Sequence, residues 1–71
     1  MSLNTKIGNR IKELRTEKNL TLEKLAYESG VSKGGLSEIE RGLKEARLST
    51  LLKITERLEI SLKDFFAGEG F

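Results

Sequence analysis

The stretch Gly30-Val-Ser-Lys-Gly-Gly-Leu-Ser-Glu-Ile-Glu-Arg-Gly42 reads as a short helix with a glycine on either side of it. Gly30 suits the left-handed position that ends a preceding helix, Ser32 is a suitable N-cap for the next one, and the last glycine ends it. Gly34 and Gly35 lie inside its first turn. Glycine is less favourable than alanine in a helix by about 1 kcal/mol, so each of the two needs a reason.

Helical periodicity continues on both sides of this stretch. Apolar residues recur at intervals of three and four, as Ile7, Ile11 and Leu14 do, and no strand-like alternation is found. The pattern predicts five helices, over about residues 5–18, 22–29, 33–41, 50–58 and 62–67. The expected N-caps are Asn4, Thr21, Ser32, Ser49 and Ser61. Because proline is absent and the loops are short, we expect a single compact all-α domain over residues 1–71.

Composition excludes several classes of protein. The 71 residues include no cysteine and no histidine, which rules out disulfides, thiol chemistry and a Cys/His zinc site. We therefore expect no metal, no cofactor and no enzyme activity. Thirteen basic residues against 11 acidic ones give a net charge of +2, which permits nucleic-acid binding without arguing for it. No apolar run approaches the roughly 18 residues of a membrane span and no signal peptide is evident, so a cytoplasmic location is expected.

The connection between the second and third predicted helices is the most informative loop. It contains only Gly30, Val31 and Ser32. A three-residue turn with glycine first, between two short amphipathic helices, is typical of a helix-turn-helix motif.

The third predicted helix has two different sides when its residues are placed 100° apart on a wheel. The side that we expect to pack on the core consists of Gly35, Leu36 and Ile39. The opposite side is small and polar, with Gly34, Ser37 and Arg41 flanked by Lys33 and Glu38. Any surface helix presents a polar side, but together with the short turn this one favours a helix that enters the major groove of DNA.

Residues 7–66 resemble the lambda-repressor-like helix-turn-helix family of Cro/repressor or XRE type. The matching segments are Ile7-Gly-x-Arg10-Ile-Lys-x-Leu-Arg15, Leu20-Thr-Leu-Glu-Lys-Leu-Ala26, Gly30-Val-Ser-Lys-Gly-x-Leu-Ser-x-Ile-Glu-Arg-Gly42, Leu48-Ser-Thr-Leu-Leu-Lys-Ile54 and Leu58-x-Ile-Ser-Leu-x-x-Phe-Phe66. The resemblance implies a five-helix fold that binds double-stranded DNA, usually as a two-fold homodimer on a palindromic site.

The same resemblance assigns roles in DNA binding to individual residues. It places Thr21 and Leu22 against a phosphate, through backbone N–H groups at a helix start. The base-facing positions are Lys33, Gly34, Ser37 and Glu38, and the residues expected to contact the DNA backbone further along are Arg41, Lys44 and Arg47.

Two of these positions depart from the family. Leucine stands at position 22 where glutamine is frequent, so the Leu22 side chain either lies at the phosphate or packs on the protein. Gly34 leaves a common base-reading position without a side chain. Base discrimination would then rest on Lys33, Ser37 and Glu38, where Glu38 either accepts from cytosine or repels misplaced phosphates.

The resemblance also implies two structural roles. Arg10 and Glu40 occupy positions that the family commonly joins in a partly buried ion pair, which would hold the third helix to the first. At the C-terminal end, the apolar residues that either complete the core or form a homodimer patch are Leu62, Phe65, Phe66 and Phe71.

The leading interpretation is a sequence-specific DNA-binding transcriptional regulator, acting as a repressor. An antitoxin, or a phage or restriction-modification control protein, would use the same chemistry, with a toxin or another protein as a further partner. A protein-interaction module that has lost DNA binding is a different class, favoured by the low net charge, Leu22 and the paired glycines. Salt-dependent binding to DNA separates these classes.

Overall fold

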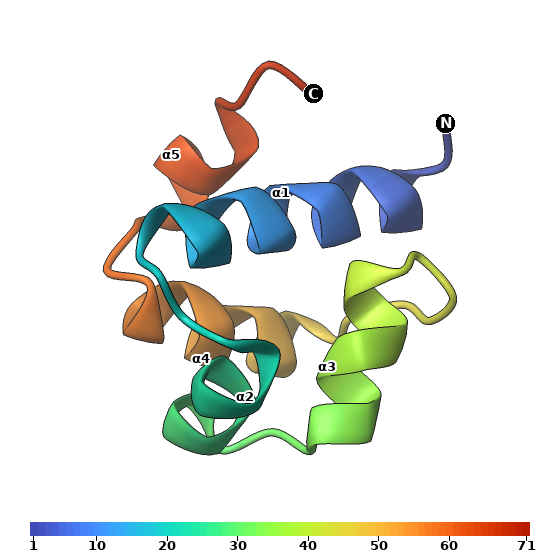
Figure 1. The fold of residues 1–71 in the computed structure, drawn as a ribbon. Coiled ribbons are helices and arrows are strands. Elements are labelled where there is room, and N and C mark those ends of the chain that lie inside the picture. Colours follow the sequence, from blue (N-terminus) through green and yellow to red (C-terminus); the bar gives the residue numbers. More distant parts are fainter.

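Five helices and no strands make up the computed structural model, which describes all of residues 1–71. They are α1 (Leu3–Glu17), α2 (Leu22–Ser29), α3 (Lys33–Glu40), α4 (Leu48–Arg57) and α5 (Leu62–Phe66). In Figure 1, α1 crosses the top of the molecule with α5 above it, α4 lies in the middle, α2 lies at the bottom and α3 stands at the right. The predicted five-helix, all-α fold is confirmed. None of the helices is long and apolar enough to cross a membrane.

Three of the five predicted N-caps are confirmed. The side-chain oxygens of Thr21, Ser32 and Ser61 each accept a hydrogen bond from the backbone N–H three residues on, at 3.1, 3.0 and 3.0 Å. Asn4 and Ser49 were wrong as caps, because α1 begins after Ser2 and α4 begins after Arg47, which makes no side-chain cap. Helices α1, α3, α4 and α5 each begin or end one or two residues away from the predicted limits.

The core lies where α1, α2, α3 and α4 converge, closed on one side by α5. Its buried apolar residues are Ile11, Leu20, Leu25, Ala26, Leu36, Ile39, Leu51, Ile54, Leu58 and Phe65. Phe65 is fully buried, so it completes the core and is excluded as a dimer contact. Leu62 also packs against this cluster, while Phe66 and Phe71 stay 39% and 38% exposed.

The close approach between α1 and α3 depends on Gly8. A Cβ at this position would overlap the carbonyl oxygen of Ile39 and lie 2.6 Å from that of Glu40. The prediction that Gly35 packs on the core is wrong, because a Cβ at Gly35 would have no core atom within 4 Å. A Cβ there would meet only the Ser32 hydroxyl at 2.7 Å and the Lys44 ammonium at 3.9 Å. The glycine that permits helix packing is therefore on α1, and it contacts the C-terminal end of α3.

Candidate nucleic-acid interface

The turn between α2 and α3 is fixed by backbone geometry. Gly30 ends α2 in the left-handed conformation, with φ of 72°. The N–H of Val31 then donates to the carbonyl of Ala26 at 3.0 Å, and the Val31 side chain packs against the core. Ser32 caps α3 through the N–H of Gly35. These contacts set the angle between α2 and α3, which is the geometry of a helix-turn-helix motif.

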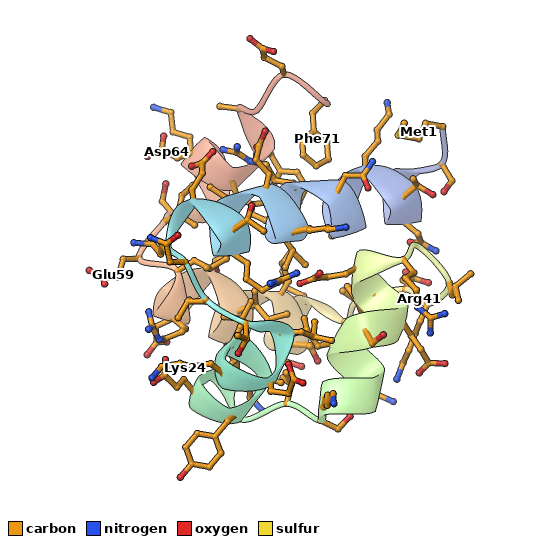
Figure 2. The ribbon with its side chains drawn as sticks, in the orientation of Figure 1. Met1, Lys24, Arg41, Glu59, Asp64 and Phe71 are labelled. Carbon is orange, nitrogen blue, oxygen red and sulfur yellow. The ribbon has the colours of Figure 1, made fainter.

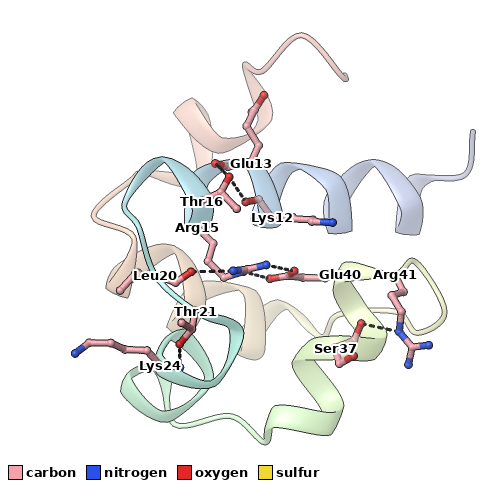
Figure 3. A network of polar contacts seen from close by, with 10 residues as sticks. All are labelled: Lys12, Glu13, Arg15, Thr16, Leu20, Thr21, Lys24, Ser37, Glu40 and Arg41. Carbon is pink, nitrogen blue, oxygen red and sulfur yellow. Dashed lines mark hydrogen bonds and ion pairs between the residues drawn. The ribbon is translucent and has the colours of Figure 1, made fainter.

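A buried ion pair holds α3 to α1, but its basic partner is Arg15. Arg15 donates to both carboxylate oxygens of Glu40, at 2.7 Å from Nε and 3.1 Å from Nη2, and its Nη1 donates to the Leu20 carbonyl at 2.8 Å (Figure 3). The side chains are 13% and 7% exposed. The hydrogen bond with Glu40 raises the pKa of Arg15 above its ordinary value, against the opposing effect of burial. The predicted pairing of Glu40 with Arg10 is wrong, although Glu40 has the predicted role.

Arg10 instead joins α1 to the end of α5. Its Nε donates to the Phe65 carbonyl at 2.8 Å, its Nη2 to the Asp64 carbonyl at 3.0 Å, and its Nη1 to Glu13 at 2.6 Å. The last carbonyls of a helix have no partner within the helix, so the guanidinium satisfies two of them. Arg10 therefore anchors α5 on α1, and its bonds go to α5 and Glu13 rather than to Glu40.

The outward side of α3 is open, as predicted. Lys33, Gly34 and Glu38 are exposed and Ser37 is half-buried. A Cβ at Gly34 would meet no atom within 4 Å, so a larger side chain has room there. This surface offers one base, one acid, one hydroxyl and a stretch of bare backbone to a ligand.

The start of α2 lies next to the start of α3. The Thr21 hydroxyl caps α2, and the half-buried Leu22 side chain packs against the core rather than reaching outward. Glu23 forms an ion pair with Lys33 at 3.1 Å. The pKa of Glu23 is lowered from its ordinary value, first by its own backbone N–H and then by the Lys33 ammonium. Sequence reasoning missed Glu23, although its place in the first turn of α2 was a usable signal.

Basic side chains continue beyond α3. Arg41, Lys44 and Arg47 are exposed, and the Arg41 side chain projects from the C-terminal end of α3 (Figure 2). Its Nε lies 3.4 Å from the Ser37 carbonyl. Lys44 and Arg47 line a groove of about 310 Å3 between the turn, α3 and α4, together with Lys53. Lys53 was not singled out from the sequence because it lies outside the segments that the resemblance assigns to DNA.

The helix-turn-helix family profile matches residues 11–65, which include all of α2, α3 and α4. The chain belongs to the helix-turn-helix family. Its helix-turn-helix relatives include the transcriptional regulator SlrR of Bacillus subtilis, 41% identical over 89% of this chain and 42% of the relative. The transcriptional repressor RghR of the same organism is 35% identical over 90% of this chain and 48% of the relative. The chain thus spans about half the length of these relatives.

Solved structures with the same helix-turn-helix fold extend the comparison. The clp gene regulator ClgR of Corynebacterium glutamicum superposes with a TM-score of 0.90 at 36% identity, over 94% of this chain and 71% of that chain. The restriction-modification controller protein C.AhdI of Aeromonas hydrophila superposes with a TM-score of 0.85 at 36% identity, over 89% of this chain and 96% of that one. These neighbours share the five-helix arrangement around the α2–α3 motif.

Proposed function

We propose that this protein is a sequence-specific DNA-binding transcriptional regulator that acts as a repressor, with α3 in the major groove of double-stranded DNA. The observation that carries the proposal is the outward side of α3, which is polar, slim at Gly34 and free of protein contacts there. A helix of this shape fits a groove about 12 Å wide. The names of SlrR and RghR as transcriptional regulator and repressor support the same function.

In this proposal the reading and anchoring residues are separate. Lys33, Ser37 and Glu38 face base edges, where lysine donates to guanine and glutamate accepts from cytosine. At Gly34 the backbone itself approaches the groove. Thr21 and the first N–H groups of α2, including that of Leu22, lie against one phosphate. Beyond the C-terminal end of α3, Arg41, Lys44 and Arg47 contact phosphates without reading sequence.

We also propose that the protein binds as a homodimer. A single small module buries too little surface, about 600–1,000 Å2, to bind DNA tightly alone. Phe66 and Phe71 support a dimer contact because they remain partly exposed and stack edge to face, with ring centroids 5.0 Å apart. Replacing both with serine should shift sedimentation equilibrium toward monomer and weaken DNA binding, while helix content measured by circular dichroism is kept. If the double variant sediments like wild type, the dimer contact lies elsewhere on the surface.

DNA binding can be tested without knowing the operator. The purified protein is used to select bound fragments from a random duplex pool, and affinity for the selected site is then measured at increasing salt concentration. The logarithm of the affinity should fall steeply with the logarithm of salt, and the slope should decrease by about one in Lys44→Gln. Absence of any enriched sequence, with no binding at low salt, would refute the proposed function and favour a protein-interaction module.

A restriction-modification controller is the second candidate. The observation in its favour is that the similarity to C.AhdI extends over 96% of that chain, and that to the control protein C.BamHI of Bacillus amyloliquefaciens over 72% of that relative at 34% identity. The selected site discriminates the two candidates. A controller should bind upstream of genes for a restriction endonuclease and a methyltransferase, whereas a general repressor should bind elsewhere.

A further inference from the structure

An ion pair joins the first turns of the two helices proposed to meet DNA. The Glu23 carboxylate on α2 lies 3.1 Å from the Lys33 ammonium on α3, and both side chains are more than half exposed. Lys33 is the only cation among the four proposed base-facing residues, so the pair neutralises the one positive group on that part of α3.

Glu23 also belongs to the first turn of α2. There the N–H of Lys24 is taken by the Thr21 hydroxyl and that of Leu25 by the Thr21 carbonyl. The N–H groups of Leu22 and Glu23 remain at the N-terminus, and the backbone N–H of Glu23 is the first cause of the lowered pKa of its carboxyl group. An acidic side chain thus lies in the first turn of α2, the end of a helix that favours a phosphate.

We propose that Glu23, in the first turn of α2, is an internal competitor of the DNA phosphate and keeps the ammonium of Lys33 paired until a duplex displaces it. This inference rests on the proposed function. A phosphate that docks on α2 must first move the carboxylate, which weakens binding to all DNA. Displacing Glu23 breaks its ion pair with Lys33. A DNA site with guanine at the right position gives the Lys33 ammonium new acceptors in exchange, whereas other DNA sequences give it none. Glu23 therefore sets the ratio of specific to non-specific affinity.

Nothing else on this face duplicates the effect of Glu23. Glu38 is the one exposed acid on α3 itself, and it forms no ion pair with any cation. Exposed ion pairs add little to stability, so removing the Glu23 charge should leave the fold intact. The alternative role for Glu23 is to hold Lys33 in position for a base, and this role predicts the opposite change in affinity for the selected site.

The test compares Glu23→Gln with Glu17→Gln, a charge-matched control at an exposed position at the end of α1 that forms no ion pair. Each protein is titrated with a mixed-sequence duplex of about 20 base pairs and with the selected site, at several salt concentrations. Relative to the control, Glu23→Gln should bind the mixed-sequence duplex about fivefold more tightly, the size expected for one unit charge about 4 Å from a phosphate in water. The salt slope should steepen by about 0.9, because Lys33 becomes free to neutralise one more phosphate.

The selected site should gain less than the mixed-sequence duplex, so the specificity ratio should fall. In a Lys33→Met background the gain from Glu23→Gln should shrink, because the released ammonium is absent. Equal affinities of Glu23→Gln and Glu17→Gln for the mixed-sequence duplex would overturn the inference, as would weaker binding of Glu23→Gln to the selected site. Either result leaves the proposed function standing, since wild type still binds. A wild-type protein that binds neither duplex refutes both.

Discussion

Removing the carboxylate of Glu40 should be among the most damaging single changes on α3. Glu40 and Arg15 are 7% and 13% exposed at the side chain and share two hydrogen bonds, so Glu40→Ala leaves a largely buried guanidinium without its anion. Breaking a buried pair from one side lowers the free energy of unfolding by about 3–5 kcal/mol. Arg15 keeps its bond to the Leu20 carbonyl, which favours the lower value, about 3 kcal/mol.

That loss is large for a chain of this size. At about 0.05–0.15 kcal/mol per residue, 71 residues give a total stability of about 4–11 kcal/mol. A domain of this length loses about 4–8 °C of melting temperature per kcal/mol, so Glu40→Ala should melt about 12–24 °C below wild type. Glu38→Ala is the matched control, because Glu38 lies on the same helix, is exposed and forms no ion pair. It should change the free energy of unfolding by no more than about 0.5 kcal/mol.

The assay is urea and thermal unfolding followed by circular dichroism at the helix band, since the chain has no tryptophan and its single tyrosine is 87% exposed. Arg15→Met combined with Glu40→Leu should be more stable than either single variant, because neither leaves a buried charge unpaired. Comparable unfolding midpoints for Glu40→Ala and Glu38→Ala would refute the reasoning, and so would strict additivity in the double variant.

Three further outcomes are expected. Gly8→Ala should lower the free energy of unfolding by about 3 kcal/mol in urea, because the new methyl overlaps the backbone of α3, whereas Gly34→Ala should be neutral or stabilising by up to about 1 kcal/mol. Gly34→Gln should keep the wild-type melting temperature but change the sequence preference found by selection, and an unchanged preference would contradict a groove position. The folded-state pKa of Glu23 is lowered, so its contribution is present above its ordinary value of 4.5 and is lost as the pH falls through the folded value. The difference in unfolding free energy between wild type and Glu23→Gln should therefore shrink from pH 7 to pH 3.

The helices and most of their N-caps could be predicted, because they depend on residues that are close together in the sequence. The caps Thr21, Ser32 and Ser61 can be predicted because each is the only suitable side chain directly before a segment with apolar residues at helical spacing. At the starts of α1 and α4 the prediction missed by two residues. Two polar candidates, Ser2 and Asn4, compete at α1, and α4 begins without a side-chain cap at all. Helix existence followed from local pattern, while helix ends depended on contacts that the pattern does not contain.

Contacts between helices were harder to predict. Arg10 and Arg15 both lie near the apolar stripe of α1, and five residues at 100° each place them about 140° apart. Which of them meets Glu40 depends on how α1 is rotated against α3, and this rotation is set by Gly8 meeting the backbone of Ile39 and Glu40. Gly35 was assigned to the core from the wheel alone, but the Cβ direction there leads to the Ser32 hydroxyl at the helix start. A helical wheel gives the direction of each side chain around the helix axis, but it does not show which other helix lies beside that residue along the axis.

The tertiary contacts of α3 are distributed unevenly, and this distribution explains how one short helix can be both fixed and available. Its C-terminal half is held by the Arg15–Glu40 pair, by Gly8 and by buried Ile39. Its N-terminal half has the cap from Ser32 and the fully buried Leu36. Lys33, however, forms only an exposed ion pair to Glu23, and Gly34 has open space around it. Because none of the buried contacts involves Lys33 or Gly34, substitutions at positions 33 and 34 can change what the helix reads without loosening it. Recognition can then vary at the N-terminal half while the angle of α3 is kept by α1.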